Sequence, residues 1–279
     1  MKKILIPVDF SDLARHAFEL GKQLQSELQA ELHFVHIVTL PSHVLLTPDG
    51  ELFDDDEMDI TQLQLEHEQA ERKLMAWIDN VQSNVVNKVL YGHVNETLLH
   101  YAQKIKADMV LMGTHGAFGM RELLNGSHAE YLAMHADMPI LSLKGEAGKR
   151  IEKMVLAADF TAILPTNISL LLALRSALQA QLYLLQIQKP GKRKREVEIQ
   201  ERMSAFAEAN GLEDVAYAIF PAEDLEEGIV RFAANNNIDL IAIGSMQRTG
   251  LNKLINGCIS ADLVNHVQKP IFTFKLKDN

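Results

Sequence analysis

Three glycines and a serine in the segment 109–140 have the residue types and the spacing to bind an anion. Gly113, Gly116 and the pair Gly126-Ser127 follow the pattern G-x2-G-x9-G-S. Because glycine has no Cβ, backbone N–H groups in such a loop can close around a phosphate. A helical segment that begins at Gly126-Ser127 adds a hydroxyl group and the positive end of a helix dipole. The pattern therefore predicts a nucleotide site that holds phosphates.

The elements around this loop are expected to place it at the edge of a sheet. An apolar run, 109–112, ends abruptly at Gly113, as a buried parallel strand would. Ligands of open parallel sheets bind where such strands give way to loops. Apolar runs alternate with helical patterns along the whole chain, which predicts an α/β fold of right-handed βαβ units. The expected strands are 3–8, 32–38, 85–91, 109–112, 139–143, 153–157, 181–187, 215–220, 240–244 and 270–274.

Helices are expected between these strands, and some of their ends can be assigned from capping residues. The expected helices are 12–30, 58–80, 95–106, a segment ending near 135, 167–180, 196–210 and 222–235. Ser11 is the expected N-cap of the first helix, and Asn95 that of the third, because both side chains can accept a hydrogen bond from a free backbone N–H. The segment 39–56, with two prolines and a run of three aspartates, is expected to be a loop.

The glycine segment recurs later in the chain. Residues 239–275 align without a gap with residues 108–144, which lie 131 positions earlier, so that Gly113 pairs with Gly244 and Pro139 with Pro270. A repeat of this length predicts two similar domains, at 1–146 and 151–279, each an open five-stranded parallel sheet with helices on both faces. Asp9 pairs with Asp159 at an offset of 150, so the second repeat lacks 19 residues (150 − 131). Most of these fall after the second strand, which predicts a reduced lid there.

The spacing of the glycines resembles the ATP-binding signature of the universal stress protein family, and the repeat extends the resemblance to the whole chain as a tandem pair. The resemblance implies a Rossmann-like fold of the adenine nucleotide alpha hydrolase type, and ATP as the ligand, with or without Mg²⁺. It also implies that Asp9 hydrogen-bonds the adenosine and that the backbone of Ile37 contacts adenine. The positions that match the family's site are Pro7, Asp9, Ile37, Met112, Gly113, His115, Gly116, Gly126, Ser127, His128 and Ala129.

The second repeat departs from this signature where phosphate would bind. Gln247 stands in place of Gly116, Cys258 in place of Ser127, and Met246 in place of His115. A side chain at 247 would block the close approach of the backbone, and a thiol is a weaker hydrogen-bond donor than a hydroxyl. We therefore expect one intact and one degenerate site. Two plainer readings stay open: the glycines could serve only tight turns, and Asp9 could simply cap the first helix together with Ser11.

The sequence favours a nucleotide-binding regulatory protein of the stress response over an enzyme. It contains neither a Walker lysine motif nor a kinase signature, and no catalytic residue is identified. A weak ATPase or autophosphorylating enzyme is one alternative. A second domain that binds another metabolite or an apolar ligand is the other.

Composition narrows the class of protein and its partners. The net charge of −10 argues against nucleic-acid binding, although 189–195 is a short basic cluster. The single cysteine, Cys258, excludes an intrachain disulfide and fits a reducing cytoplasm. No apolar run reaches the roughly 20 residues of a membrane span. The expected partners are an adenine nucleotide and the other domain of the same chain, with a homodimer as a further arrangement.

Histidines are unevenly distributed, with ten of the eleven in the first half. They do not form an HExxH motif or any regular ligand spacing, so they are expected to be ordinary surface or core residues, and no metal site is predicted.

Overall fold

The computed structural model describes residues 2–47, 51–54, 57–78, 84–114, 128–144, 150–160, 168–191, 196–246 and 267–276. The chain forms two compact units, Met1–Gly113 and Thr114–Asn279. The second unit includes the end of the first sequence repeat as well as the second repeat. The domain boundaries expected at 146 and 151 therefore do not coincide with the division into compact units, and they stay a prediction about the repeats.

The first unit is built on four parallel strands. Their order across the sheet is β6-β1-β2-β5, and their bounds are β1 Lys2–Pro7, β2 Ala30–Thr39, β5 Val85–Gly92 and β6 Met109–Gly113. The central strands are apolar and buried: Ile4, Leu5 and Ile6 of β1 are at most 1% exposed. Such continuous burial is typical of parallel strands that are covered on both faces.

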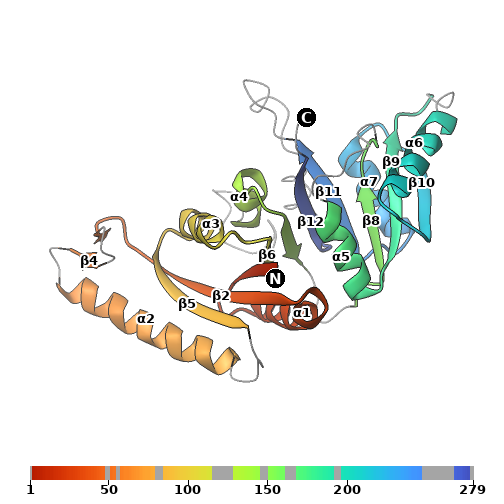
Figure 1. The fold of residues 1–279 in the computed structure, drawn as a ribbon. Helices are drawn as coiled ribbons and strands as arrows, with labels where there is room; N and C mark the ends of the chain where they lie inside the picture. Colours follow the sequence, from red (N-terminus) through yellow and green to blue (C-terminus); the bar gives the residue numbers. More distant parts are fainter. Residues whose placement is uncertain are drawn as a thin grey trace. The chain divides into compact units, whose positions relative to one another are not determined.

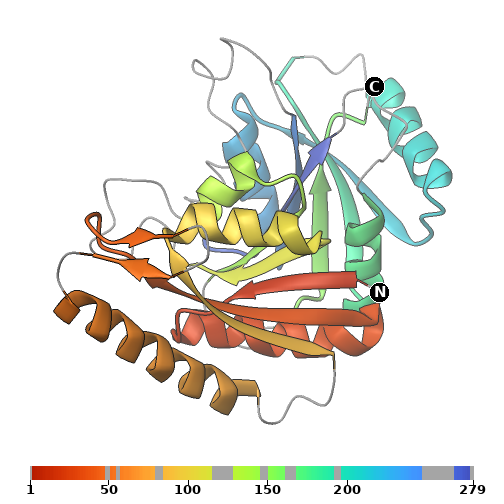
Figure 2. The ribbon, with the colours of Figure 1, turned by 60° about the vertical axis from the view of Figure 1, so that its left-hand side comes forward.

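Helices cover both faces of this sheet. The helices α1 (Asp12–Leu28) and α2 (Glu57–Ile78) lie on one face, and α3 (Val94–Ile105) lies on the other (Figures 1 and 2). Ser11 caps α1 as expected, because its Oγ accepts a hydrogen bond from the Ala14 N–H at 3.1 Å. Aromatic contacts join the two helices of the first face: Trp77 of α2 lies 5.8 Å from Phe18 of α1, ring centre to ring centre.

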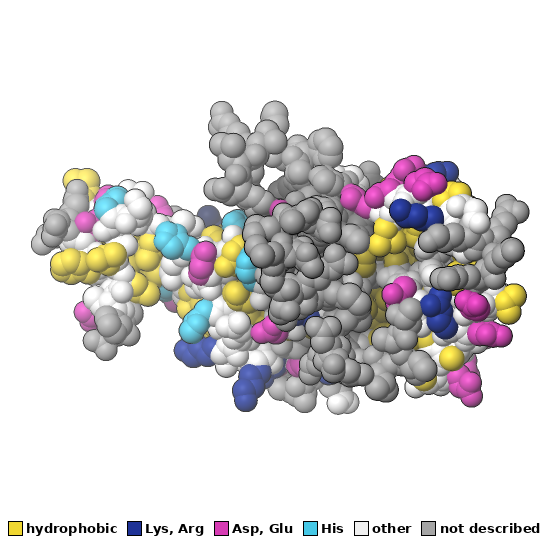
Figure 3. Space-filling model, turned by 90° about the horizontal axis from the view of Figure 1, so that it is seen from above, with side chains coloured by type: hydrophobic (Ala, Val, Ile, Leu, Met, Phe, Trp, Pro, Cys, Tyr) yellow, Lys and Arg dark blue, Asp and Glu magenta, His cyan; other side chains and the backbone are white. Residues whose placement is uncertain are grey.

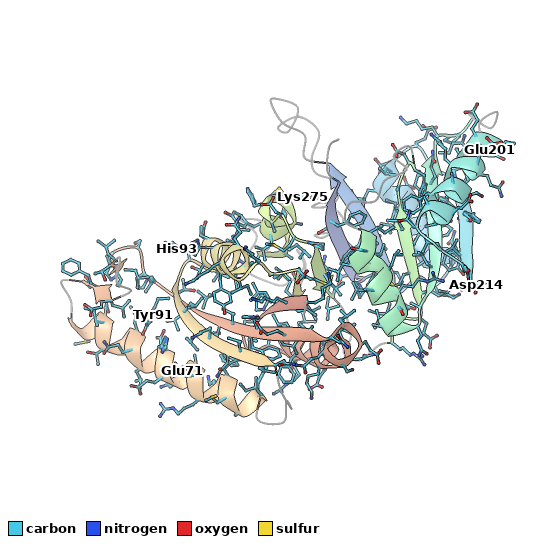
Figure 4. All side chains as sticks on the ribbon, in the orientation of Figure 1. Glu71, Tyr91, His93, Glu201, Asp214 and Lys275 are labelled. Atoms are coloured by element: carbon cyan, nitrogen blue, oxygen red, sulfur yellow. The ribbon has the colours of Figure 1, made fainter. Side chains whose placement is uncertain are left out.

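The contact of α2 with the sheet edge is partly polar. Tyr91 of β5 stacks on His67 of α2 with 4.9 Å between ring centres, and its hydroxyl donates to the Leu63 carbonyl at 3.4 Å. Burial raises the pKa of Tyr91, and the nearby carboxylate of Glu71 raises it further. Figure 4 shows Tyr91 on β5 and Glu71 on α2. The phenol therefore stays neutral and can hold this hydrogen bond at physiological pH.

Two expectations for the first repeat were wrong. The segment 39–56 is not only a loop: it contains a small antiparallel hairpin of β3 (Leu45–Leu46) and β4 (Leu52–Phe53). Strands of two residues are too short to show a periodicity in the sequence. Asn95 does not cap α3, since the helix already begins at Val94 and the N-cap is His93, whose side chain makes no capping hydrogen bond.

The second unit contains five parallel strands from the second repeat and one strand, β7 (Ile140–Leu143), from the first. The order is β10-β9-β8-β11-β12-β7. The bounds of the other strands are β8 Lys153–Ala157, β9 Gln181–Gln188, β10 Val215–Pro221, β11 Leu240–Met246 and β12 Ile271–Leu276. The helices are α4 His128–His135, α5 Ile168–Leu178, α6 Glu196–Ala209 and α7 Leu225–Asn235. The helices α5 and α6 lie on one face of the sheet and α7 on the other (Figures 1 and 2).

The last strands of the two repeats pair with each other. β12 runs antiparallel to β7, with Phe272 opposite Leu141. The buried hydroxyl of Ser142 donates to the Ile271 carbonyl at 3.3 Å. Lys275, labelled in Figure 4, forms a 2.9 Å ion pair with Asp137, which precedes β7. The two repeats, expected to be partners within one chain, are thus joined through these strands, which explains why β7 belongs to the second compact unit.

Matching hydrogen bonds show how closely the repeats correspond. In the first, the Asp108 carboxylate accepts from the Lys3 N–H at 2.8 Å; in the second, Asp239 accepts from the Lys153 N–H at 3.0 Å. The lid region differs, as expected: α2 has 22 residues and α6 has 14. The helix expected from 222 begins three residues later, at Leu225, because Asp224 caps it by accepting from the Glu227 N–H. Among the described residues, no helix is long and apolar enough to cross a membrane.

Candidate functional site

The carboxyl ends of β1, β2 and β6 bring together the part of the predicted site that lies in the first unit. β1 is flanked by β6 and β2, and the last registered pairs place Pro7 opposite Val35 and Leu5 opposite Val110. Extending both registers by two residues places Asp9 beside Ile37 and Pro7 beside Met112. These four residues and Gly113 therefore share one edge of the sheet, the edge at which open α/β sheets bind ligands.

Asp9 is exposed at this edge, where one of its carboxylate oxygens binds Ser11 and the other can accept from a ligand. Its Oδ1 accepts hydrogen bonds from the Ser11 N–H at 2.9 Å and from the Ser11 hydroxyl at 2.5 Å. Ser11 in turn caps α1, so Asp9 supports the cap indirectly, by holding Ser11. Within the described part of the chain both bonds end on Oδ1, which leaves Oδ2 available to accept from a ligand. A carboxylate held in this way can receive a hydrogen bond from an amine or a hydroxyl.

The residue after this aspartate has an unusual backbone conformation in both repeats. Phe10 has φ of 63° and Phe160, which follows Asp159, has φ of 52°. Left-handed conformations are rare for bulky residues and are strained by about 1–3 kcal/mol, so they persist only where the surroundings require them. Packing supplies this requirement, since the Phe10 ring lies 4.7 Å from the His36 ring and the Phe160 ring 5.1 Å from that of Phe206. Nothing in the local sequence indicated this turn.

His36 supports the same loop from the neighbouring strand, and the sequence reasoning did not assign it a role. Its Nδ1 donates to the Val8 carbonyl, one residue before Asp9, at 2.6 Å. Because a carbonyl oxygen can only accept, this contact assigns the ring hydrogen to Nδ1. Burial lowers the pKa of His36 below its ordinary value, an effect that the hydrogen bond to Val8 and the charge of Asp9 oppose. His36 is therefore neutral at physiological pH and acts by positioning the loop.

Gly113 has a structural requirement of its own at the end of β6. A Cβ at this position would overlap the backbone carbonyl group of Leu13, in the first turn of α1. The glycine therefore permits a close approach between strand and helix, which is a packing function. This finding adds to the expected phosphate role of Gly113 and does not test it.

The remaining predicted site residues divide into two groups. His128 and Ala129 begin α4 in the second unit, where the side chain of His128 is exposed and Ala129 is fully buried. The phosphate-loop positions His115, Gly116, Gly126 and Ser127 lie outside the described residues, as do Gln247 and Cys258 of the second repeat. The structure thus describes the nucleoside end of the expected site and leaves the phosphate end a prediction.

The described edge carries few polar side chains. Its described polar side chains include the exposed carboxylate of Asp9, the Ser11 hydroxyl that is bonded to it, and a neutral His36 that is bonded to backbone. In Figure 3 the histidine side chains are spread singly over the face shown, with no gathering around one point. Among the described residues of this edge, no pair of side chains is arranged as a nucleophile and a base. This edge can therefore recognise hydrogen-bond donors on a ligand but carries no evident catalytic pair.

Comparison with known proteins agrees with this architecture. The universal stress protein family matches residues 1–144 and again residues 156–275. The chain belongs to the universal stress protein family. The double match means that it contains two copies of the family's domain in tandem.

Individual relatives support this assignment. A universal stress protein of Methanocaldococcus jannaschii is 29% identical over 143 residues, which are 51% of this chain and 82% of that protein. A universal stress protein of Synechocystis is 22% identical over 293 aligned positions, covering 99% of this chain and all of that protein. The crystal structure of a universal stress protein from Archaeoglobus fulgidus superimposes with a TM-score of 0.70 at 16% identity, over 99% of this chain and 97% of that one. The last similarity concerns the fold alone.

Proposed function

We propose that this tandem universal stress protein binds ATP in its first repeat and responds to the nucleotide as a regulatory protein. The observation that carries the proposal is the pattern Gly113, Gly116, Gly126-Ser127, which directly follows β6. The pattern therefore starts at the sheet edge where, within the described part of the chain, the bonds of Asp9 to Ser11 leave its Oδ2 available to a ligand. A nucleotide needs both ends of such a site: backbone N–H groups and a helix start for phosphates, and an acceptor for its amine or hydroxyl groups.

The second repeat is proposed to have lost nucleotide binding. It keeps the fold, the exposed Asp159 and the left-handed Phe160. It has Gln247 and Cys258 where the first repeat has Gly116 and Ser127. Hydrogen bonds to a charged group contribute about 1.5–3 kcal/mol each, so losing two of them is enough to abolish binding at ordinary nucleotide concentrations. The repeat is proposed to be a structural partner of the first.

Calorimetric titration of the full chain with ATP tests both statements, with Mg²⁺ present or absent. We expect about one ATP per chain. The variant Gly116→Gln, which copies the residue of the second repeat, should bind at least about tenfold more weakly, or about 1.4 kcal/mol. The matched variant Gln247→Gly should leave the affinity of the first site unchanged. Two equivalent sites in the unmodified chain, or full affinity in a folded Gly116→Gln variant, would contradict the proposal.

A further inference from the structure

The β3–β4 hairpin of the first repeat brings together three side chains of the kinds that bind metal ions. His43 precedes β3, Asp54 follows β4, and Asp59 lies in the first turn of α2. One ligand atom from each lies within 4.8 Å of the other two. The second repeat has no counterpart of this insertion, because only the seven residues 189–195 separate β9 from α6, against seventeen between β2 and α2. The cluster is thus a property of the first repeat.

The distances between the three groups are close to those of ligands on one ion. His43 Nε2 lies 2.7 Å from Asp59 Oδ2 and 3.5 Å from Asp54 Oδ2. In a four-coordinate site with metal–ligand bonds of about 2.0–2.2 Å, neighbouring ligand atoms are roughly 3.3–3.5 Å apart. Small rotations of exposed side chains are sufficient to reach that geometry, since the side chains of His43 and Asp59 are about half exposed.

Asp54 supplies the observation that points to a missing ligand. The side chain of Asp54 is only 9% exposed, so its carboxylate is buried. Among the described residues its Oδ2 accepts no hydrogen bond, although His43 Nε2 lies at ion-pair distance from it. A buried carboxylate oxygen without a hydrogen bond is costly, and proteins generally satisfy such an oxygen with a donor or a cation. The oxygen faces the point at which His43 and Asp59 meet.

We propose that His43, Asp54 and Asp59 form a binding site for a divalent transition-metal ion, with Zn²⁺ as the ion that matches them best. One imidazole nitrogen and two carboxylate oxygens are ligands that zinc accepts, whereas Mg²⁺ and Ca²⁺ prefer oxygen ligands alone. A neutral His43 binds the ion through Nε2 and keeps its proton on Nδ1. Three protein ligands leave a fourth position for water, on the solvent side of the cluster.

Such an ion would fasten the hairpin to the start of α2. Without it, the described contacts between these segments include the His43–Asp59 hydrogen bond, which lies at the surface. With it, three segments that are separate along the sequence share one centre, and the charges of two carboxylates are neutralised. β3 and β4 are linked by a hydrogen bond from the Thr47 N–H to the Glu51 carbonyl at 2.8 Å, so an ion bound to His43 and Asp54 would hold both strands.

The test is a calorimetric titration of the full chain with Zn²⁺, carried out without nucleotide, without a histidine tag and with Mg²⁺ in excess. We expect one Zn²⁺ to bind with micromolar or higher affinity. His43→Ala and Asp54→Asn should each weaken this binding at least about tenfold. His100→Ala removes an exposed histidine from α3 and should have no effect. Adding Zn²⁺ should slow hydrogen exchange of the β3 and β4 amides in the unmodified chain and in His100→Ala. It should not slow this exchange in His43→Ala or Asp54→Asn.

Other outcomes would overturn the proposal. Equal Zn²⁺ affinity in all variants would show that other histidines hold an adventitious ion only. Binding weaker than micromolar in the unmodified chain would leave the cluster a hydrogen-bonded contact of His43 with Asp59. Should Asp54→Asn unfold, the exposed His43→Ala still decides the matter, since its side chain contributes little to the core. None of these readouts involves ATP, so failure here does not affect the proposed function.

Discussion

The absence of a side chain at Gly113 lets the end of β6 pack against the backbone of Leu13 in α1. Gly21 of α1 offers a contrast, because a Cβ there would come too close to Cδ1 of Ile6, the far end of a flexible side chain, and its other near neighbours lie at ordinary contact distance. The two glycines therefore differ in what an added methyl group would displace. At Gly113 backbone must move, whereas at Gly21 a side chain can rotate.

We expect Gly113→Ala to lower the free energy of unfolding by about 1–3 kcal/mol, because the added methyl group overpacks against backbone. Gly21→Ala should be close to neutral, since the gain in helix propensity of about 1 kcal/mol offsets the shift of Ile6. Urea denaturation of both variants measures the difference. Equal midpoints would mean that the end of β6 can move away from α1 at little cost.

His36 provides a second prediction, which concerns pH. The pKa of His36 in the folded chain lies below the ordinary value of about 6.5. As the pH falls below 6.5, the imidazole is protonated in the unfolded chain before it is protonated in the folded chain, which favours unfolding. Stability should therefore fall as the pH drops through 6.5 and below, at up to about 1.4 kcal/mol per pH unit. His36→Gln, which copies Gln186 of the second repeat, should remove this contribution and flatten the dependence.

The comparison for His36 requires unfolding free energies of both proteins between pH 7.5 and 5.5, from urea denaturation. His100→Gln serves as the control because His100 is exposed on α3, and its pH dependence should equal that of the unmodified chain. Parallel curves for His36→Gln and the unmodified chain would show that the burial of His36 does not couple its protonation to folding.

At the level of elements, the sequence predicted the strands and helices well and their special features poorly. Long apolar runs such as β2 and the amphipathic pattern of α1 have a clear periodicity. The β3–β4 hairpin has none, and Asn95 was assigned as a cap although α3 begins one residue earlier. Local preference places an asparagine near a helix start, but it does not fix the first helical residue to better than about one or two positions.

The same limit applies to the candidate site. The family resemblance predicted that Asp9, Ile37 and Gly113 belong to one site, and the strand order of the structure places them at one sheet edge. The left-handed turn at Phe10, the hydrogen bond from His36 to Val8 and the cluster around His43 depend on contacts between residues far apart along the chain. A sequence pattern gives the spacing of residues along one segment. It does not give the distances in space between residues of different segments.

The packing of α2 allows a test within one helix. Leu74 is buried at 1% exposure, whereas the adjacent Met75 is 58% exposed. Leu74→Ala should therefore cost about 2–5 kcal/mol through lost burial and a cavity, and Met75→Ala less than about 0.5 kcal/mol. The chain's only tryptophan, Trp77, lies in α2 beside Phe10, so its fluorescence reports unfolding of this part of the first unit. Equal effects of the two substitutions would contradict the packing of this helix on the sheet.

At the level of the whole molecule, the pairing of β7 with β12 makes the two repeats depend on each other. Ile140, Leu141 and Ser142 of β7 are buried at no more than 1% exposure, and in β12 so are Ile271 and Phe272. Cutting the chain between the repeats would leave each fragment with an open, largely apolar strand edge. Such edges pair with other chains, either with an identical copy or in aggregates.

We therefore expect the fragment 1–146, expressed alone, to form a dimer or an insoluble product, and the fragment 151–279 to behave in the same way. Co-expression of the two fragments should restore a soluble complex of one copy of each, with the mass of the uncut chain, because β7 then regains β12 as its neighbour. Light scattering coupled to size exclusion measures these masses. A soluble monomer of 1–146 would show that β7 tolerates an open edge, and that strand pairing is not what joins the repeats. Lys275 and Asp137 form an ion pair across this contact, so Asp137→Lys in 1–146 should weaken the co-expressed complex without preventing self-association of the fragment.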